Sequence, residues 1–206
     1  MKKALILLAG GSGKRFSNPK KRIPKQFIKF DSYNLIEYFL HNLESKIFDR
    51  INIVTKHTSQ KNYLSKLIND FPKHNIQFVK SGRTRQESSK KGIYSLIKYN
   101  PSKVLIHDTA RPLASNKLIK RLLKSLKQNK SCAPYIISND FTKNTLTNKE
   151  VDNKKIIHIQ TPQAFIFKSI VKAHNNAKKN DYKDDTSLME NIGIKTKFIK
   201  GEKSNI

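Results

Sequence analysis

The chain has 206 residues, a single cysteine and a formal net charge of +27. This length suits one domain with a core of its own, and a lone Cys132 excludes a disulfide framework and suits a reducing cytoplasm. No apolar run approaches the ~20 residues of a membrane span, and the run 5–9 is too short for a signal peptide, so we expect a cytoplasmic protein without a membrane partner.

The positive charge is compatible with nucleic-acid binding, because basic surfaces recruit phosphates through counterion release. Lysine supplies 35 of the 42 basic residues, however, and it is scattered over nearly every segment without interleaved aromatic residues. We therefore interpret the charge as solvated surface and expect no specific nucleic-acid partner. Four of the seven arginines fall in the three motifs described below, and the arginine fork suits anionic ligands.

The first motif directly follows the first predicted strand. Residues 3–9 form a continuous apolar run, typical of a strand covered on both faces in a parallel sheet. The loop after it contains Gly10, Gly11, Ser12, Gly13, Lys14 and Arg15, and Lys25 follows ten residues later. Because glycines let backbone N–H groups close around an anion, the motif predicts a triphosphate-binding loop. The alternative is a glycine-rich turn with incidental charge; GxxxxGK[ST] and GxGxxG are both absent, which disfavours ATPases and dehydrogenases.

Apolar runs alternate with amphipathic stretches along most of the chain. The predicted strands are 3–9, 27–30, 50–55, 76–80, 103–107, 132–137 and 195–200, and the predicted helices are 34–46, 58–70, 85–98, 115–128, 168–179 and 186–192. This alternation predicts an α/β fold with a Rossmann-like, mostly parallel sheet and helices on both faces. All three motifs lie at carboxyl ends of predicted strands, where such sheets bind ligands. The polar stretch 139–160 predicts a projecting β-arm that packs on a second subunit.

The second motif, residues 81–88, joins a predicted strand to a helix. Gly82 allows a tight turn, and Thr84 with Glu87 three residues later forms a capping box. Arg85 and Ser88 fall in the first turns of the helix, near the positive end of its dipole. A nucleotide base or phosphate can dock there.

The third motif, residues 107–112, follows the strand 103–107. Asp108 can hold a divalent cation or a ligand hydroxyl, and Arg111 can clamp a phosphate; an Asp108–Arg111 ion pair is the alternative. We assign no role to His107.

Residues 161–165 predict a turn into a buried strand or helix, and 184–187 predict a helix cap. Zinc-ligand spacing and GxSxG are both absent, so metallohydrolase and serine-hydrolase functions have no support.

Taken in order, seven segments resemble 2-C-methyl-D-erythritol 4-phosphate cytidylyltransferases over essentially the whole chain: LLAGGSGKRF, PKQF, SGRTRQESSKKGI, HDTARP, QTPQAF, DDTSLMENIG and KGEKSNI. The RQES and DDTS variants look most like the cytidylyltransferase half of the form fused to a cyclodiphosphate synthase. The resemblance implies a nucleotide-diphospho-sugar-transferase-like fold. It also implies transfer of CMP from CTP to the polyol phosphate, Mg²⁺ or another divalent cation as cofactor, and a homodimer formed through the arm 139–160.

The resemblance further implies roles for single residues. Arg15 and Lys25 match the family's transition-state stabilisers. The residues that match its CTP-binding positions are Ala9, Gly10, Gly11, Ser12, Gly13, Lys14, Gly82, Arg85 and Ser88. Those that match or replace its acceptor-binding positions are Asp108, Arg111, Thr142 and Asn153, and Asp108 is also the candidate metal ligand.

The chain departs from the family's pattern in the arm and at its end. Phe141 separates Asp140 from Thr142, where the family has Asp-Thr, and Asn153 replaces an arginine. The family's substrate-positioning lysine follows the Asn-Ile at which this chain ends, so we expect a single domain, 1–206, truncated at its C-terminus. Two alternatives stay open: a ribitol-5-phosphate cytidylyltransferase, which shares the glycine loop, PKQF and TPQ, and a non-catalytic nucleotide- or RNA-binding relative.

Overall fold

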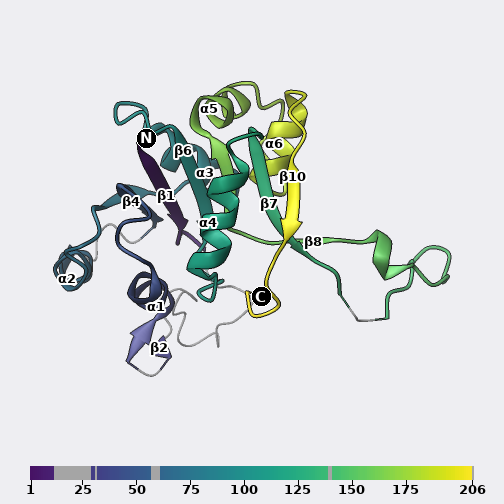
Figure 1. The fold of residues 1–206 in the computed structure, drawn as a ribbon, viewed down its shortest axis with the longest axis horizontal. Helices are drawn as coiled ribbons and strands as arrows, with labels where there is room; N and C mark the ends of the chain where they lie inside the picture. Colours follow the sequence, from purple (N-terminus) through teal and green to yellow (C-terminus); the bar gives the residue numbers. More distant parts are fainter. Residues whose placement is uncertain (12–28, 31, 57–60, 139–140, 206) are drawn as a thin grey trace.

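A sheet with helices packed on both faces forms the body of the protein (Figure 1). The computed structural model describes residues 1–11, 29–30, 32–56, 61–138 and 141–205. The strands are β1 (Lys3–Leu8), β2 (Lys29–Phe30), β3 (Tyr33–Asn34), β4 (Arg50–Thr55), β5 (Ile76–Lys80), β6 (Lys103–Asp108), β7 (Ser131–Ile136), β8 (His158–Ile159), β9 (Gln163–Ile166) and β10 (Lys197–Lys200). The helices are α1 (Leu35–Asn42), α2 (Lys61–Asp70), α3 (Arg85–Tyr94), α4 (Asn116–Ser125), α5 (Phe167–Asn175), α6 (Asp185–Asn191) and the 3₁₀ helix η2 (Asn153–Lys155).

The main sheet has the strand order β10-β7-β9-β6-β1-β4-β5, with β8 paired to β7. β1 is parallel to β4 and β6, β4 to β5, and β7 to β10, so the predicted mostly parallel sheet is confirmed. β9 runs antiparallel between β6 and β7. Of the two possibilities open for residues 161–165, the buried strand is therefore the one observed. β2 and β3 pair with each other in a separate small sheet.

The alternation of side chains along β1 divides the core into two layers. Leu5 and Leu7 pack with residues of α1, α2 and α4 on one face of the sheet. Ala4 and Ile6 pack with residues of α3, α5 and α6 on the other face. All four β1 side chains are fully buried. Burial on both faces accounts for the continuous apolar run and confirms the prediction of helices on both sides.

Several helices are shorter than predicted. α1 ends at Asn42 because Leu43 is extended (φ −81°, ψ 124°). After α3 and α4 the chain continues in tighter turns, with Ile97 N–H donating to Tyr94 O (3.1 Å) and Lys127 N–H to Lys124 O (3.0 Å). The amphipathic pattern runs on through these turns, so periodicity alone extends the helices too far. The beginnings of the predicted strand 27–30 and helix 58–70 lie outside the described residues.

The chain between β7 and β8 projects from the body as an arm (Figure 1). The projection was predicted, but its β content is lower than expected, because the described part of the arm has only β8 and one bridge, between Lys143 and Glu150. Residues 139–140 lie outside the described residues. Phe141 is 68% exposed and Leu146 is 94% exposed, so the arm buries neither side chain in this chain.

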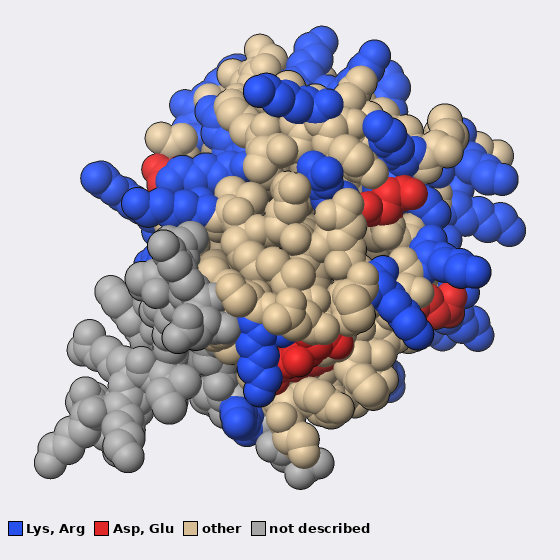
Figure 2. Space-filling model, turned by 90° about the vertical axis from the view of Figure 1, so that its left-hand side faces the viewer, with Lys and Arg blue, Asp and Glu red and all other residues tan. Residues whose placement is uncertain are grey.

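Lysine and arginine side chains are spread around the margin of the face in Figure 2, with other residues between them. This distribution fits the scattered lysines of the sequence. Within the described ranges, no helix combines the length and the apolar character that crossing a membrane requires.

Candidate active site

The carboxyl ends of β1, β5 and β6 bring the three motifs to one edge of the sheet, toward which the β1 arrow points in Figure 1. Backbone bonds continue the strands into the motifs: Ala9 N–H donates to Val54 O (2.8 Å), and Ser81 N–H to Thr55 O (2.9 Å). Thr109 N–H donates to Leu8 O (3.3 Å), which joins the third motif to the first. The structure therefore places Ala9, Gly82 and Asp108 around one edge, as a shared site requires.

Gly10 lies where the first and second motifs touch. A Cβ atom at Gly10 would stand 2.7 Å from Ser81 Cβ and 3.0 Å from Ser81 Oγ, closer than real side chains approach. A glycine is needed here because the two turns pack together. Gly11, by contrast, is exposed, and a Cβ there would meet no atom of the described residues within 4 Å.

The turn into α3 is held by Ser88. Its hydroxyl accepts Gly82 N–H (3.1 Å) and donates to Thr84 O (2.8 Å). Thr84 caps α3 as predicted, accepting Glu87 N–H (3.1 Å), but the Glu87 carboxylate accepts Arg83 N–H (2.6 Å), one residue earlier than a capping box. A Cβ at Gly82 would lie 2.2 Å from Glu87 Cβ and 2.8 Å from its carbonyl carbon. The turn is thus packed against backbone.

Arg85 joins the second motif to the third. Its Nε lies 3.2 Å from Asp108 Oδ1, and its Nη1 lies 2.8 Å from Asp185 Oδ2. Burial alone would lower the pKa of Arg85, but Asp185 and Asp108 outweigh it and raise this pKa. Arg85 therefore stays charged at the predicted CTP side while two of its nitrogens bind carboxylates. The alternative of an Asp108–Arg111 ion pair is wrong, because Asp108 pairs with Arg85.

The two aspartates of the predicted cap 184–187, Asp184 and Asp185, have different roles. Asp184 is the N-cap of α6 and accepts Ser187 N–H (3.0 Å). Asp185 instead points into the interior, where it accepts Ser89 Oγ–H (2.5 Å) and lies 3.1 Å from His174 Nε2. Burial alone would raise the pKa of Asp185, but Arg85, His174 and Ser89 hold it well below its usual range. The sequence pattern did not indicate this role, because either of two adjacent aspartates before a helix can cap it.

His107 is fully buried behind Asp108. Its Nε2 lies 2.9 Å from Arg111 O and its Nδ1 lies 2.9 Å from Thr161 Oγ1, which also accepts Asp108 N–H (3.1 Å). A carbonyl can only accept, so Nε2 carries the proton and the Thr161 hydroxyl donates to Nδ1. Burial lowers the pKa of His107 to about 3. The ring is a neutral structural bridge.

Arg111 points to the C-terminal segment. Its Nη1 donates to Asn205 O (2.9 Å). The Gln160 side chain holds the same segment, donating to Asn205 O (2.7 Å) and Glu202 O (2.9 Å) and accepting Glu202 N–H (3.2 Å). Buried Asn205 in turn donates to Thr161 O (2.8 Å). These bonds surround Arg111, a predicted acceptor-binding residue, with Gln160, Glu202 and Asn205, which lie in the segments QTPQAF and KGEKSNI but were given no individual role.

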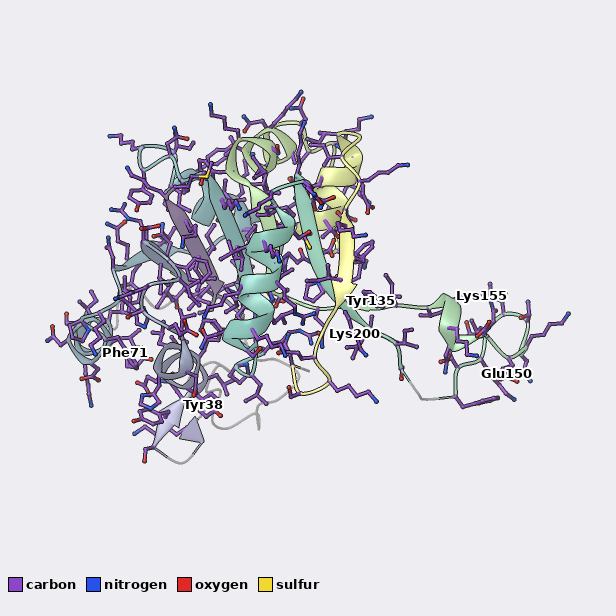
Figure 3. The ribbon with its side chains drawn as sticks, viewed as in Figure 1. Tyr38, Phe71, Tyr135, Glu150, Lys155 and Lys200 are labelled. Atoms are coloured by element: carbon purple, nitrogen blue, oxygen red, sulfur yellow. The ribbon has the colours of Figure 1, made fainter. Side chains whose placement is uncertain are left out.

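Thr142 and Asn153 are not brought to this edge in the same chain. Both lie on the arm, whose labelled residues Glu150 and Lys155 stand apart from the body, while Tyr135 and Lys200 mark its root (Figure 3). Thr142 O accepts Val151 N–H (2.9 Å) within the arm. Asn153 begins η2. In one chain, these two predicted acceptor residues are therefore separate from Asp108 and Arg111.

Asp108, the predicted metal ligand, has its carboxylate at this edge of the sheet. In the described ranges, His, Cys, Asp and Glu side chains do not gather in threes, as a metal site built by protein alone would need. Mg²⁺ is commonly held by one or two carboxylates together with substrate phosphates. The Asp108 side chain is 33% exposed and only its Oδ1 binds Arg85, which suits such a shared site. The predicted residues Ser12, Gly13, Lys14, Arg15 and Lys25 lie outside the described residues.

Comparisons with known proteins agree with this architecture. The chain is 35% identical to the bifunctional enzyme IspD/IspF of Pelagibacter ubique, covering all of this chain and 54% of that protein. It is 33% identical to the 2-C-methyl-D-erythritol 4-phosphate cytidylyltransferase of Clostridium beijerinckii, covering 98% of this chain and 90% of that one. The chain thus spans about half the length of its bifunctional relative and most of its single-function relative.

Solved structures show the same fold. A 4-diphosphocytidyl-2C-methyl-D-erythritol synthase from Anaerococcus prevotii superposes with a TM-score of 0.84 at 25% identity, covering 100% of this chain and 89% of that one. The bifunctional IspDF of Campylobacter jejuni gives 0.82 at 29% identity, covering 100% and 51%. The family model for 2-C-methyl-D-erythritol 4-phosphate cytidylyltransferase matches residues 3–206. With that match and relatives above 30% identity, the chain belongs to the 2-C-methyl-D-erythritol 4-phosphate cytidylyltransferase family.

Proposed function

We propose that the protein transfers CMP from CTP to 2-C-methyl-D-erythritol 4-phosphate, an isoprenoid precursor of the non-mevalonate pathway, and releases pyrophosphate. Family membership over residues 3–206 carries this proposal. The convergence of Gly10, Gly82, Asp108 and Arg111 at one edge of the sheet supports it. CTP lies on the Gly82 side and the acceptor on the Arg111 side.

The reaction is an in-line displacement at phosphorus. An oxygen of the acceptor phosphate attacks the α-phosphorus of CTP, a new P–O bond forms, and the bond to the bridging oxygen breaks as pyrophosphate leaves. Such chemistry depends on positioning and on positive charge where phosphoryl oxygens crowd together. Arg15 and Lys25 supply that charge, the loop from Gly10 to Lys14 cradles the triphosphate, and Arg111 binds the acceptor phosphate.

A divalent cation completes the site in this proposal. Asp108 would hold Mg²⁺ jointly with the nucleotide phosphates, and the ion would neutralise charge on the triphosphate. Arg85 fixes one oxygen of Asp108 at 3.2 Å and thereby orients the carboxylate.

The arm is proposed to form a homodimer. Phe141 and Leu146 are 68% and 94% exposed, and a second copy would give these apolar side chains something to pack on. In that dimer Thr142 and Asn153 serve the partner's acceptor site. Sedimentation of a dimer at micromolar concentration is expected, and a monomer would refute this part.

The single cysteine, Cys132, is free and buried, as suits the proposed cytoplasmic location.

Initial rates of pyrophosphate release test the function. With CTP and Mg²⁺, we expect 2-C-methyl-D-erythritol 4-phosphate to react well above ribitol 5-phosphate. Equal or reversed rates would indicate the ribitol-5-phosphate enzyme, and no turnover with either would indicate a non-catalytic relative.

Arg15→Ala and Lys25→Ala should each lower kcat by about 10²–10³, with smaller effects on nucleotide affinity.

A further inference from the structure

Asp185 is a fully buried carboxylate with three side-chain partners. Its Oδ1 accepts from Ser89 Oγ (2.5 Å) and lies 3.1 Å from His174 Nε2, and its Oδ2 accepts from Arg85 Nη1 (2.8 Å). These partners come from α3 and α5, whereas Asp185 begins α6. Helix capping does not explain the arrangement, because Asp184 caps α6. A buried ion pair is also weak evidence for a stabilising role, since apolar replacements are often as stable.

Arg85 connects this buried carboxylate to the candidate site. Its side chain is 30% exposed, between Asp185 at 1% and Asp108 at 33%. The guanidinium is planar and rigid, so the bond from Nη1 to Asp185 determines the direction in which Nε faces Asp108. Asp185 can therefore influence Asp108 without touching any substrate.

The third nitrogen of the Arg85 guanidinium indicates that the two carboxylates determine the orientation of this side chain. Arg85 Nη2 is buried and has no hydrogen-bond partner among the described residues. A buried donor without a partner is costly, so the bonds of Nε to Asp108 and of Nη1 to Asp185 must outweigh that cost in this rotamer. The two carboxylates select it.

We propose that Asp185, supported by His174 and Ser89, is a positioning residue: it holds Arg85 in the orientation that fixes the Asp108 carboxylate at the acceptor side. The inference rests on the proposed function in one respect, namely that Asp108 acts on the acceptor side. Asp185 itself contacts neither substrate, and its effect passes through Arg85.

Steady-state kinetics of Asp185→Ala, with both substrates varied, test the proposal. The acceptor KM should rise about tenfold, as expected for a misplaced charge-assisted contact, and the KM for CTP should also rise, because Arg85 is a predicted CTP-binding residue and Asp108 would share its cation with the nucleotide. Asp184→Ala is the matched control, since it removes the α6 cap one residue earlier. It should lower Tm and leave both KM values within twofold. If Asp185→Ala only lowers Tm, as the control does, Asp185 is merely structural and the proposal is wrong.

A milder variant covers the case in which Asp185→Ala does not fold. Ser89→Ala removes one donor to Asp185 and should raise the acceptor KM about threefold; an unchanged acceptor KM would overturn the proposal. A crystal structure of whichever Asp185 or Ser89 variant folds gives a readout without turnover. The Arg85 Nε–Asp108 Oδ1 contact should be lost in the Asp185 variant and lengthened in the Ser89 variant, and retention at its present 3.2 Å contradicts positioning. A wild-type chain without transferase activity would refute the proposed function alone, because this structural readout is independent of it.

Discussion

The proposed nucleotide side and the proposed acceptor side of the candidate site are built in different ways. On the nucleotide side, Gly82 N–H and Ser88 Oγ bond within one turn, six residues apart. On the acceptor side, Gln160 and Asn205 are 45 residues apart, and Arg111 and Asn205 are 94 apart. The first side is a close-packed backbone turn and the second is a network of long-range side-chain bonds. Substitutions that add volume should therefore weaken CTP binding at the first side. Substitutions that remove hydrogen bonds should weaken acceptor binding at the second.

The largest effect is expected from Gly82→Ala. Its new methyl group would stand 2.8 Å from a backbone carbon of Glu87, which cannot move aside as a side-chain end can. Overpacking of this kind costs about 1–3 kcal/mol. If the turn shifts to relieve it, CTP binding weakens by about tenfold to a hundredfold, which calorimetric titration would measure.

Gly92→Ala is the control for this variant. It crowds the opposite end of the same helix, where its Cβ would lie 2.7 Å from Ile6 Cγ2 and 2.9 Å from Val54 Cγ2. We expect a lower Tm with CTP affinity within twofold of wild type. Equal losses of CTP affinity in both variants would mean that crowding α3 anywhere disturbs the site, and the local character of the turn would be disproved.

A smaller effect, on acceptor binding instead of CTP binding, is expected from Gln160→Leu. The substitution removes three hydrogen bonds to residues 202–205 and leaves Glu202 N–H without its partner. The acceptor KM should rise about tenfold as Arg111 loses its fixed partner, while CTP affinity stays within twofold. Gln77→Leu, at an exposed position of β5, should change neither value. A loss of CTP affinity in Gln160→Leu would show that the two sides are not built separately.

The last effect concerns the pH dependence of stability rather than substrate binding, and it arises at His107, which lies between Arg111 O and Thr161 Oγ1. Burial lowers the pKa of His107 to about 3, so protonation favours the unfolded chain. The stability due to neutral His107 is present above about pH 6.5 and is lost as the pH falls toward 3, with a slope of up to about 1.4 kcal/mol per pH unit. Unfolding of His107→Gln between pH 7 and 5 should show a shallower pH dependence than wild type. Identical slopes would mean that His107 does not titrate as its burial requires.

The contrast between local turns and long-range contacts also explains which features could be predicted from the sequence. The apolar run of β1, the turn at Gly82 and the Asp184 cap are local patterns, and each was predicted close to its observed place. The partners of Arg85, the interior role of Asp185 and the bonds of Gln160 depend on segments that meet only in the fold. The antiparallel direction of β9 is likewise set by its insertion between β6 and β7, and no local pattern encodes it.

The central claim is cytidylyl transfer, and ³¹P NMR of the reaction mixture tests it most directly. With the chain, CTP, Mg²⁺ and 2-C-methyl-D-erythritol 4-phosphate, we predict that the acceptor phosphate signal is replaced by the coupled pair of a diphosphate linkage, together with one equivalent of pyrophosphate. An acceptor signal that stays unchanged while CTP is hydrolysed, or while CTP is not consumed, would contradict the account.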